Sequence, residues 1–248
     1  MAVGKSSEKL LSVLIPTLNE AAYLEATIAC VRARAADPSA IEIVVADCGS
    51  TDGTTEIAQA AGAILASCDS TPEGPCNRAE ALNLAAACAT GDHFLFLHAD
   101  SQVPEHFDAL IAQALAGDVM GGAFEFELEG NEFGLRMVEL INRVRYRVWP
   151  LYYGDQGIFI HRLGFIASQG YPNSGIMEDA DFCRRLLRLG RLQRLPQRMV
   201  TSARRFREGG TYRVLGHDVW LFFRDLVGLT NARYSKAYQA NNVARGNE

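Results

Sequence analysis

The sequence contains no long uninterrupted run of apolar residues. Its most apolar late stretch, Val219 to Leu229, is broken by Arg224 and Asp225. A membrane span takes about 20 apolar residues, so this stretch is too short to cross a bilayer, although an interfacial helix is compatible with it. The opening residues, MAVGKSSEKL, also hold no apolar segment typical of a signal peptide. We therefore expect neither a membrane span nor a signal peptide.

Cysteine pairs with metal-site spacing are also missing. The six cysteines stand at positions 30, 48, 68, 76, 88 and 183. They form no CxxC pair and no dense framework of the kind that staples small secreted domains. Reduced thiols are the natural interpretation, so we expect a cytoplasmic protein, either free or at the inner face of the membrane.

Positive charge is scarce overall but concentrated late in the chain. The 248 residues carry 24 Lys and Arg against 29 Asp and Glu, a net charge of −5, which argues against a nucleic-acid partner. Residues 178–248 nevertheless hold 14 basic and only 7 acidic residues. This basic part favours an anionic ligand or a membrane surface, or it is simply a solvated face. Hydrophobic residues make up 48% of the chain, enough to bury the core of one domain over 1–248.

The first half of the chain alternates strand and helix patterns. Runs such as IEIVVA at 41–46 are typical of buried parallel strands. The expected strands are Leu10–Pro16, Ile41–Ala46, Ala63–Ala66 and His93–Leu97. The expected helices are Ala21–Ala35, Thr54–Ala61, Asn77–Ala89 and Pro104–Ala116. These successive β-α units predict an α/β fold with a mainly parallel, Rossmann-like sheet and flanking helices.

After Gly117 the pattern becomes less regular. In residues 119–128 apolar and polar side chains alternate, as in an exposed or mixed-sheet strand. Gly130-Asn131 is the best candidate for a boundary between the two halves, but it is too short to be a domain linker. The further expected strands are Val119–Leu128, Gly157–His161 and Val200–Phe206. The further expected helices are Glu132–Val148, Glu178–Leu189 and Val214–Val227. We expect this half to be a C-terminal extension of the same domain.

Polar residues gather after three of the expected parallel strands. They read TLNE at 17–20, DCGSTD at 47–52 and HAD at 98–100. Ligands bind at the carboxyl ends of the strands in an open parallel sheet, so three such clusters predict a site at this edge. The sequence lacks both GxGxxG after the first strand and GxxxxGK[ST]. Their absence argues against a dinucleotide dehydrogenase and a P-loop NTPase.

Four segments follow one another in a characteristic order: IPTLNE, VVADCGSTDGT, NRAEALNLAAACATGD and FLFLHAD. In this order and spacing they resemble the family 2 glycosyltransferases of the GT-A fold, and a later Glu178-Asp179 continues the resemblance. The resemblance implies a nucleotide-sugar-binding half at about 10–116 and an acceptor-side half at about 117–248. It also implies transfer of a sugar from a nucleoside diphosphate sugar to an acceptor hydroxyl, with inversion and a divalent metal, Mn²⁺ or Mg²⁺.

The same resemblance assigns the donor side. Asp100 matches the last Asp of the family's DxD-like motif and is the expected metal ligand, because a metal neutralises the leaving diphosphate. His98 is an auxiliary contact or a structural residue. Cys48 departs from the family's usual Asp-Asp, which leaves the nucleotide base open. The nucleotide-sugar-binding candidates are Pro16, Thr17, Asn19, Glu20, Asp47, Cys48, Asp52, Arg78, His98 and Ala99.

The acceptor side needs a base, because a hydroxyl is a poor nucleophile until it loses its proton. Glu178 and Asp179 open a helix, whose dipole favours an ionised acid. The resemblance makes Asp179 the expected base and Glu178 its neighbour; the alternative is a capping pair without a catalytic role. Further candidates near the acceptor or the diphosphate are Asp155, Gln156, Arg204 and Arg205.

Two other functions and one surface question stay open. A nucleotidyltransferase of similar topology usually has a glycine-rich, basic first loop, whereas this loop reads PTLNE. A non-catalytic sugar-nucleotide or glycan-binding relic has no need of Asp100 and Asp179. Trp220, Phe222 and Phe223 follow an arginine-rich stretch, which predicts a peripheral membrane contact. Alternatively, these aromatic residues pack into the protein's own core or a homodimer contact.

Overall fold

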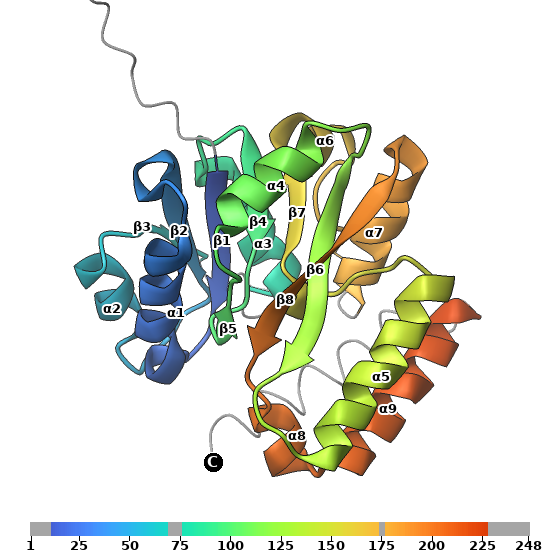
Figure 1. The fold of residues 1–248 in the computed structure, drawn as a ribbon. Helices are drawn as coiled ribbons and strands as arrows, with labels where there is room; N and C mark the ends of the chain where they lie inside the picture. The colour runs from blue at the N-terminus through green and yellow to red at the C-terminus, as the bar shows by residue number, and fades with distance from the viewer. Residues whose placement is uncertain (1–10, 69–75, 174–176, 228–248) are drawn as a thin grey trace, which may run out of the picture.

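A computed structural model describes residues 11–68, 76–173 and 177–227. The expected first strand begins at Leu10, and the basic part at 178–248 includes residues 228–248, so both predictions lie partly outside the described residues. Within these ranges eight strands form one sheet in the order β3-β2-β1-β4-β7-β6-β8-β5. Figure 1 shows the sheet curling between helices on both faces, with α5, α8 and α9 grouped at the lower right.

The first half of the chain forms the parallel part of the sheet, as the sequence predicts. Strands β1 (Leu11–Thr17), β2 (Ile41–Asp47), β3 (Ile64–Ser67) and β4 (His93–Phe96) pair in parallel. Helices α1 (Ala21–Arg34), α2 (Thr54–Ala60), α3 (Arg78–Cys88) and α4 (Phe107–Leu115) connect or flank them. The expected elements of this half are confirmed, with small shifts at their ends.

Two hydrophobic layers cover the two faces of the sheet. One layer joins Leu14 and Val44 of the strands to Leu82 of α3 and Phe182 of α7 (Glu178–Leu189). The other joins the opposite faces of the same strands to α1, α2 and α4, with Ile28 among its buried members. Strands buried on both faces read as continuous apolar runs, which is why β1 and β2 were recognisable in the sequence.

The second half adds strands of mixed direction. Strand β7 (Ile158–His161) runs antiparallel to β4 and β6 (Gly121–Leu128), while β6 pairs in parallel with β8 (Leu192–Thr201). The short β5 (Ser101–Gln102) is antiparallel to the end of β8. A Cβ on Gly122 would collide with the backbone oxygen of Gln193, so the close approach of β6 and β8 requires glycine there.

The helices of the second half build a separate small core. Helices α5 (Phe133–Val148), α8 (Arg204–Gly209) and α9 (Thr211–Leu226) pack against the far end of β6. Phe126, Leu135, Val138 and Phe206 are buried in this core. The remaining elements are α6 (Arg162–Ala167) and two single turns, η1 (Pro38–Ala40) and η2 (Gly154–Gln156). No helix within the described ranges is both long and apolar enough to cross a membrane.

The expected strand Val200–Phe206 is wrong. The strand is Leu192–Thr201, and a helix begins at Arg204. Pro196 lies inside this strand where the pairing with β6 shifts register, since Phe124 faces Leu195 and Glu125 already faces Arg198. Proline is tolerated in a strand at such a bulge because no ladder hydrogen bond is needed from it. The proline and the flanking arginines hid a strand that only its pairing with β6 explains. Helix α6 and strand β5 were not expected either.

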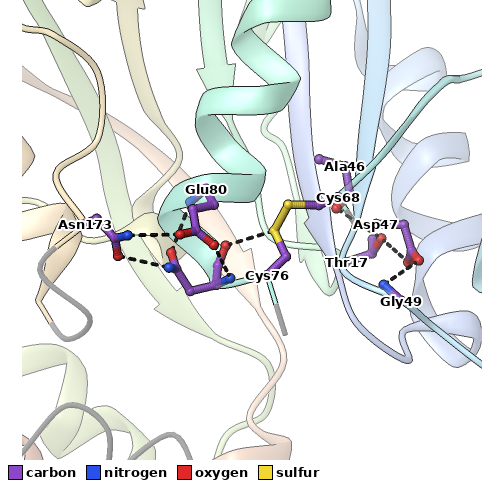
Figure 2. Close-up of a disulfide and its surroundings, with 9 residues drawn as sticks. Thr17, Ala46, Asp47, Gly49, Cys68, Cys76, Glu80 and Asn173 are labelled. Atoms are coloured by element: carbon purple, nitrogen blue, oxygen red, sulfur yellow. Dashed lines mark hydrogen bonds between the residues drawn. A yellow bond between two sulfur atoms is a disulfide. The ribbon is translucent and has the colours of Figure 1, made fainter. Parts of the chain in front are cut away.

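The expectation that all six cysteines are reduced thiols is also wrong. Cys68, just after β3, and Cys76, just before α3, form a disulfide with their Cα atoms 5.9 Å apart, a normal separation for such a bond. The other cysteines, at 30, 48, 88 and 183, are free. The bond ties the edge of the parallel sheet to the start of α3 (Figure 2). The spacing of the two cysteines in the sequence does not reveal this pairing, because it depends on how β3 and α3 are placed in the fold.

Candidate active site

The loops after β1 and β2 hold each other at the carboxyl edge of the sheet. Asn19 has a left-handed backbone (φ 56°), a conformation that asparagine adopts more readily than most residues. Its amide N–H donates to Ser50 Oγ (2.8 Å), and its side-chain oxygen accepts from Thr51 N (2.9 Å). Pro16 is half-buried near the end of β1 and pairs in register with Ala46 of β2. Hydrogen bonds between the expected donor residues therefore hold the loops after β1 and β2 together.

The carboxylate of Asp47 accepts hydrogen bonds from residues of these same two loops. Its Oδ1 accepts from the Thr17 hydroxyl (3.0 Å), and its Oδ2 accepts from the amides of Gly49 (3.0 Å) and Ser50 (2.8 Å). Only 5% of the residue is exposed. In Figure 2 the Asp47 carboxylate points toward Gly49 of the turn that follows β2. Asp47 thus shapes the loop, as a short polar side chain does in an Asx turn.

Cys48 and Asp52 also have contacts that stabilise the fold. Cys48 is buried and packs in the apolar layer that includes Cys76. Burial, with the nearby charge of Asp47, raises the pKa of the Cys48 thiol to about 11, so it stays protonated and apolar. Asp52 is exposed and accepts from the amides of Ala21 (3.0 Å) and Thr54 (3.1 Å) at the starts of α1 and α2. It satisfies helix N-termini that would otherwise lack partners.

The end of β4 brings the third cluster to the same edge. Ala99 is buried, and its carbonyl accepts from the Thr27 hydroxyl at 2.6 Å. Asp100 has two long contacts, from Thr201 Oγ1 to Oδ1 and from Arg204 Nε to Oδ2, each 3.4 Å. Burial raises the pKa of Asp100, although the charge of Arg204 opposes the rise. Asp100 is therefore a largely buried carboxylate that its neighbours hold only weakly.

Arg78 connects this donor edge to the acidic pair on α7. It is the first residue of α3, directly after Asn77, which caps the helix through a capping box with Glu80. Its guanidinium lies 3.5 Å from Glu178 Oε1 and 3.4 Å from Asp179 Oδ2, and it also contacts His98 Nε2. The loop after β4 and the starts of α3 and α7 thus meet at one cation.

His98 is uncharged in this setting. Burial and the positive charges of Arg78 and Arg204 hold the pKa of His98 well below its usual value. A guanidinium can only donate, so the neutral ring accepts from Arg78 through Nε2, and His98 would have to give up that contact to bind a metal through this nitrogen. The sequence left His98 between a functional and a structural role, and the structure puts it at the centre of the cluster.

Glu178 and Asp179 lie at the N-terminus of α7, as expected. Asp179 Oδ2 accepts from the amide of Gly154 at 2.9 Å. Its Oδ1 is buried and has no hydrogen-bond partner among the described residues. Burial and the neighbouring Asp179 raise the pKa of Glu178, while Arg78 opposes the rise. Arg78 thus contacts both acids, and Asp179 differs from Glu178 because it also accepts from the backbone amide of Gly154.

The polar turn before β7 borders the acidic pair. A side chain on Gly154 would displace the ends of the Arg78 and His98 side chains, so glycine lets this turn lie against the two residues. Burial and the charge of Asp179 raise the pKa of Asp155 to about 6, against the effect of Arg145. Gln156 is 1% exposed and donates to the carbonyl of Phe124 (3.3 Å), which makes it a structural residue of the turn.

Arg204 and Arg205, the two arginines after β8, contact different partners. Arg204 contacts Glu20 Oε1 (2.5 Å) as well as Asp100, and so reaches the donor edge. Arg205 is more than half exposed and pairs with Asp218 on α9. That both arginines close on a diphosphate stays a prediction; of the two, Arg204 contacts the acids of the donor edge in this structure.

Three residues of the cluster were not among the sequence candidates. Thr201 donates to Asp100, Tyr23 lies under the Arg204 guanidinium at 4.6 Å, and the Arg145 guanidinium lies 4.1 Å from the Tyr153 ring. The sequence carried no signal for Thr201, because only the pairing of β5 with β8 places it beside Asp100. Tyr23 and Arg145 looked like ordinary helix residues.

The donor set fits a divalent metal that takes most of its ligands from elsewhere. No group of three or more His, Cys, Asp or Glu side chains suited to a metal occurs in the described part of the chain. Mg²⁺ is commonly held by only one or two carboxylates together with substrate phosphates. Asp100, buried and weakly engaged, is a suitable single carboxylate for that arrangement, and the neutral His98 lies near it.

The fold matches solved glycosyltransferase structures. The mannosyltransferase PcManGT of Pyrobaculum calidifontis, solved with GDP-Man and Mn²⁺, aligns with a TM-score of 0.60 and 22% identity over 77% of this chain. The chain spans only 56% of the length of that protein. Glucosyl-3-phosphoglycerate synthase of Mycobacterium tuberculosis, solved with Mn²⁺, UDP and glucosyl-3-phosphoglycerate, aligns with a TM-score of 0.59 and 21% identity over 90% of this chain and 82% of that one. Identities this low show the fold, which is GT-A as expected.

A third similar structure is Staphylococcus aureus TarS 1–349 with UDP, at a TM-score of 0.57 and 17% identity over 78% of this chain and 60% of that one. No curated protein matches the chain at a significant level. The model of the family "Glycosyl transferase family 2" matches residues 12–166. That range is more than half of the chain and contains the loops after β1, β2 and β4. The chain therefore belongs to glycosyl transferase family 2.

Proposed function

We propose that this protein is an inverting, metal-dependent glycosyltransferase that moves a sugar from a nucleoside diphosphate sugar to an acceptor hydroxyl. The observation that carries the proposal is the position of Arg78, which contacts His98 of the donor edge and both acids of α7. A donor edge and a candidate base thereby share one site. A binding protein without catalysis would not require the second group.

The donor side of the proposal rests on Asp100 and the arginines. Asp100 would hold a divalent ion, with His98 as a neighbouring neutral ligand or sugar contact. A bound Mn²⁺ or Mg²⁺ would neutralise the negative charge that grows on the leaving diphosphate. Arg78 and Arg204 bring further positive charge to the same place. The solved relatives bind GDP-Man or UDP, and the buried Cys48 of this chain favours neither base.

The acceptor side of the proposal assigns the base to Asp179. Gly154 N–H holds one carboxylate oxygen, and the other is buried without a partner in the described structure. The acceptor O–H proton would pass to that oxygen while the new bond to the anomeric carbon forms and the bond to the diphosphate breaks. A single displacement of this kind inverts the anomeric carbon. Glu178 and Asp155 would line the same acidic pocket, with Arg78 keeping the pair from repelling each other.

The test is a panel of nucleotide sugars assayed for donor hydrolysis and transfer with Mn²⁺ or Mg²⁺, and again with EDTA. Asp100→Ala should keep its fold but lose metal-dependent nucleoside diphosphate binding and turnover. Glu105→Ala, a change of an acid that is 69% exposed in its side chain, serves as the matched control and should behave as wild type.

The outcomes separate the competing functions. Full activity in EDTA or in Asp100→Ala would contradict metal dependence. Pyrophosphate release from a nucleoside triphosphate would indicate a nucleotidyltransferase instead. Donor binding with neither hydrolysis nor transfer, for every sugar tried, would indicate a non-catalytic binding protein.

A further inference from the structure

Arg204 occupies an unusual position for a residue that is expected to contact the donor. Its guanidinium lies 2.5 Å from Glu20 Oε1 and 3.4 Å from Asp100 Oδ2, and it stacks 4.6 Å from the Tyr23 ring. Glu20 and Asp100 are 18% and 13% exposed in their side chains. A single cation therefore neutralises two largely buried acids, one of which is the expected metal ligand.

A divalent ion on Asp100 would stand within a few ångströms of this guanidinium. Two positive groups at one carboxylate repel each other strongly where water is excluded. Arg204 and the metal therefore compete for Asp100, unless something negative arrives with the metal. A diphosphate is such a group, and arginine binds phosphate oxygens well.

The local structure lets the side chain exchange partners without moving the strand. Ser202 N donates to the carbonyl of Asp100 (3.1 Å), and Ser101 pairs with Thr201 across β5 and β8. The backbone just before Arg204 is thus tied to the donor edge. The Arg204 side chain is 33% exposed, so it has room to rotate toward a ligand at the surface.

We propose that Arg204 is a resident counter-ion of the donor site, which occupies Asp100 and Glu20 when no donor is bound and transfers to the diphosphate when metal and nucleotide bind together. This inference rests on the proposed function and adds a regulatory property to it. Arg204 makes the metal alone bind weakly and couples metal binding to nucleotide binding. Coupling between two ligands is reciprocal, so each raises the affinity of the other by the same factor.

The experiment measures Mn²⁺ binding by electron paramagnetic resonance, first without nucleotide and then with UDP or GDP. Arg204→Gln should bind Mn²⁺ alone more tightly than wild type, by roughly 5–150-fold, the usual range of such couplings. With Mn²⁺ saturating, the same variant should bind UDP or GDP roughly 10–100-fold more weakly, because it loses a charge-assisted contact to phosphate. Arg204→Lys keeps the charge and should stay close to wild type in the metal-alone measurement.

Arg207→Gln is the matched control, since it removes the same charge from the same helix but from a pair with Glu132. It should leave both affinities unchanged. Thermal melts check that each variant is folded. Equal Mn²⁺ affinities of wild type and a folded Arg204→Gln would overturn the counter-ion role.

The result also separates this inference from the proposed function. If the wild-type protein binds neither UDP nor GDP with Mn²⁺, the proposed function fails. The metal-alone comparison uses no nucleotide and still decides whether Arg204 competes for Asp100.

Discussion

The carboxylates of the two donor loops and those of the centre of the site are held in different ways. Asp47 and Asp52 accept from backbone amides and hydroxyls of their own loops. Asp100 and Asp179, in contrast, depend partly on arginine side chains from distant elements. Asp47, Asp52 and Asp100 were expected on the donor side, whereas Asp179 was the expected base.

The difference distinguishes residues that build the site from residues that are free to react. A carboxylate whose oxygens are satisfied by fixed amides has little to offer a ligand, and removing it exposes buried donors. A buried carboxylate held by a flexible guanidinium can exchange that partner for a metal, a proton or a hydroxyl. The contrast predicts that substitutions in the first region affect stability and those in the second affect activity.

The largest effect is expected for Asp179→Asn. Asparagine has nearly the same shape and can still accept from Gly154 N–H, but it cannot take a proton from the acceptor. We expect kcat to fall by roughly 10²–10⁴-fold with donor affinity unchanged, the usual loss for a general base. Steady-state kinetics and calorimetric titration with the donor measure the two quantities.

Glu178→Gln is the control for that experiment, since it changes the adjacent acid of the same pair. It should cost less in kcat than Asp179→Asn. A larger loss for Glu178→Gln would reverse the two roles, and a loss of donor affinity in both would indicate that the pair binds the donor instead.

The next effect concerns stability and comes from the loop region. Asp47→Ala removes the acceptor of the Thr17 hydroxyl and of the amides of Gly49 and Ser50. Leaving such donors unpaired should lower the free energy of unfolding by about 2–4 kcal/mol. Urea denaturation measures it. Asp52→Ala, an exposed helix-capping position, should lose less, about 1 kcal/mol; an equal loss would contradict the burial argument.

A smaller and pH-dependent effect is expected for Asp155→Asn. Burial raises the pKa of Asp155 from its usual 3.8 to about 6, so the folded state binds the proton more tightly than the unfolded state. That contribution to stability is fully present below about pH 4 and is lost as the pH rises through about 6. Wild type should therefore lose on the order of 1–3 kcal/mol through this residue by about pH 8.

The uncharged asparagine does not titrate, so Asp155→Asn should be more stable than wild type near pH 8 and similar to it near pH 4. Thermal melts at the two pH values make the comparison. The same stability difference at both values would show that Asp155 does not titrate as described.

The smallest effect concerns the surface of α9. Phe222 packs against Trp149 with ring centroids 5.6 Å apart, and Leu221 is buried. Trp220 and Phe223 are 43% and 57% exposed, so only part of this aromatic stretch packs internally. The sequence-based expectation of a peripheral membrane contact stays a prediction for the exposed pair, as does a homodimer contact.

Flotation with vesicles that contain anionic lipid, at low salt, decides between them. A membrane contact should be weak and should fall on Trp220→Ala combined with Phe223→Ala, a pair chosen because neither side chain is buried. Absence of lipid-dependent binding would reject the membrane contact, and a concentration-dependent shift in size-exclusion chromatography would favour the dimer.

The parallel half of the fold was predictable because its evidence is local. The buried run of β2 and the turn residues after it stand next to each other in the sequence, and a buried strand reads as continuous apolar residues. Strand β8 was not predictable from its own residues. Pro196 is acceptable there only because the pairing with β6 contains a bulge. The disulfide of Cys68 and Cys76 likewise depends on the tertiary placement of the end of β3 beside the start of α3.

The sequence by itself determined which residue types stand at the carboxyl ends of the strands, because ordered hydrophobic runs fix where each strand ends. The end of β4 thus placed Asp100 among the candidates, and the family resemblance added Arg78 and Asp179 at the starts of two helices. Only the tertiary structure decided which charges meet. Arg204 and Glu20 are 184 residues apart in the chain, yet their side chains touch. Spacing along the sequence carries no information about such a pair, because packing of α8 against the donor edge, and not local propensity, brings the two charges together.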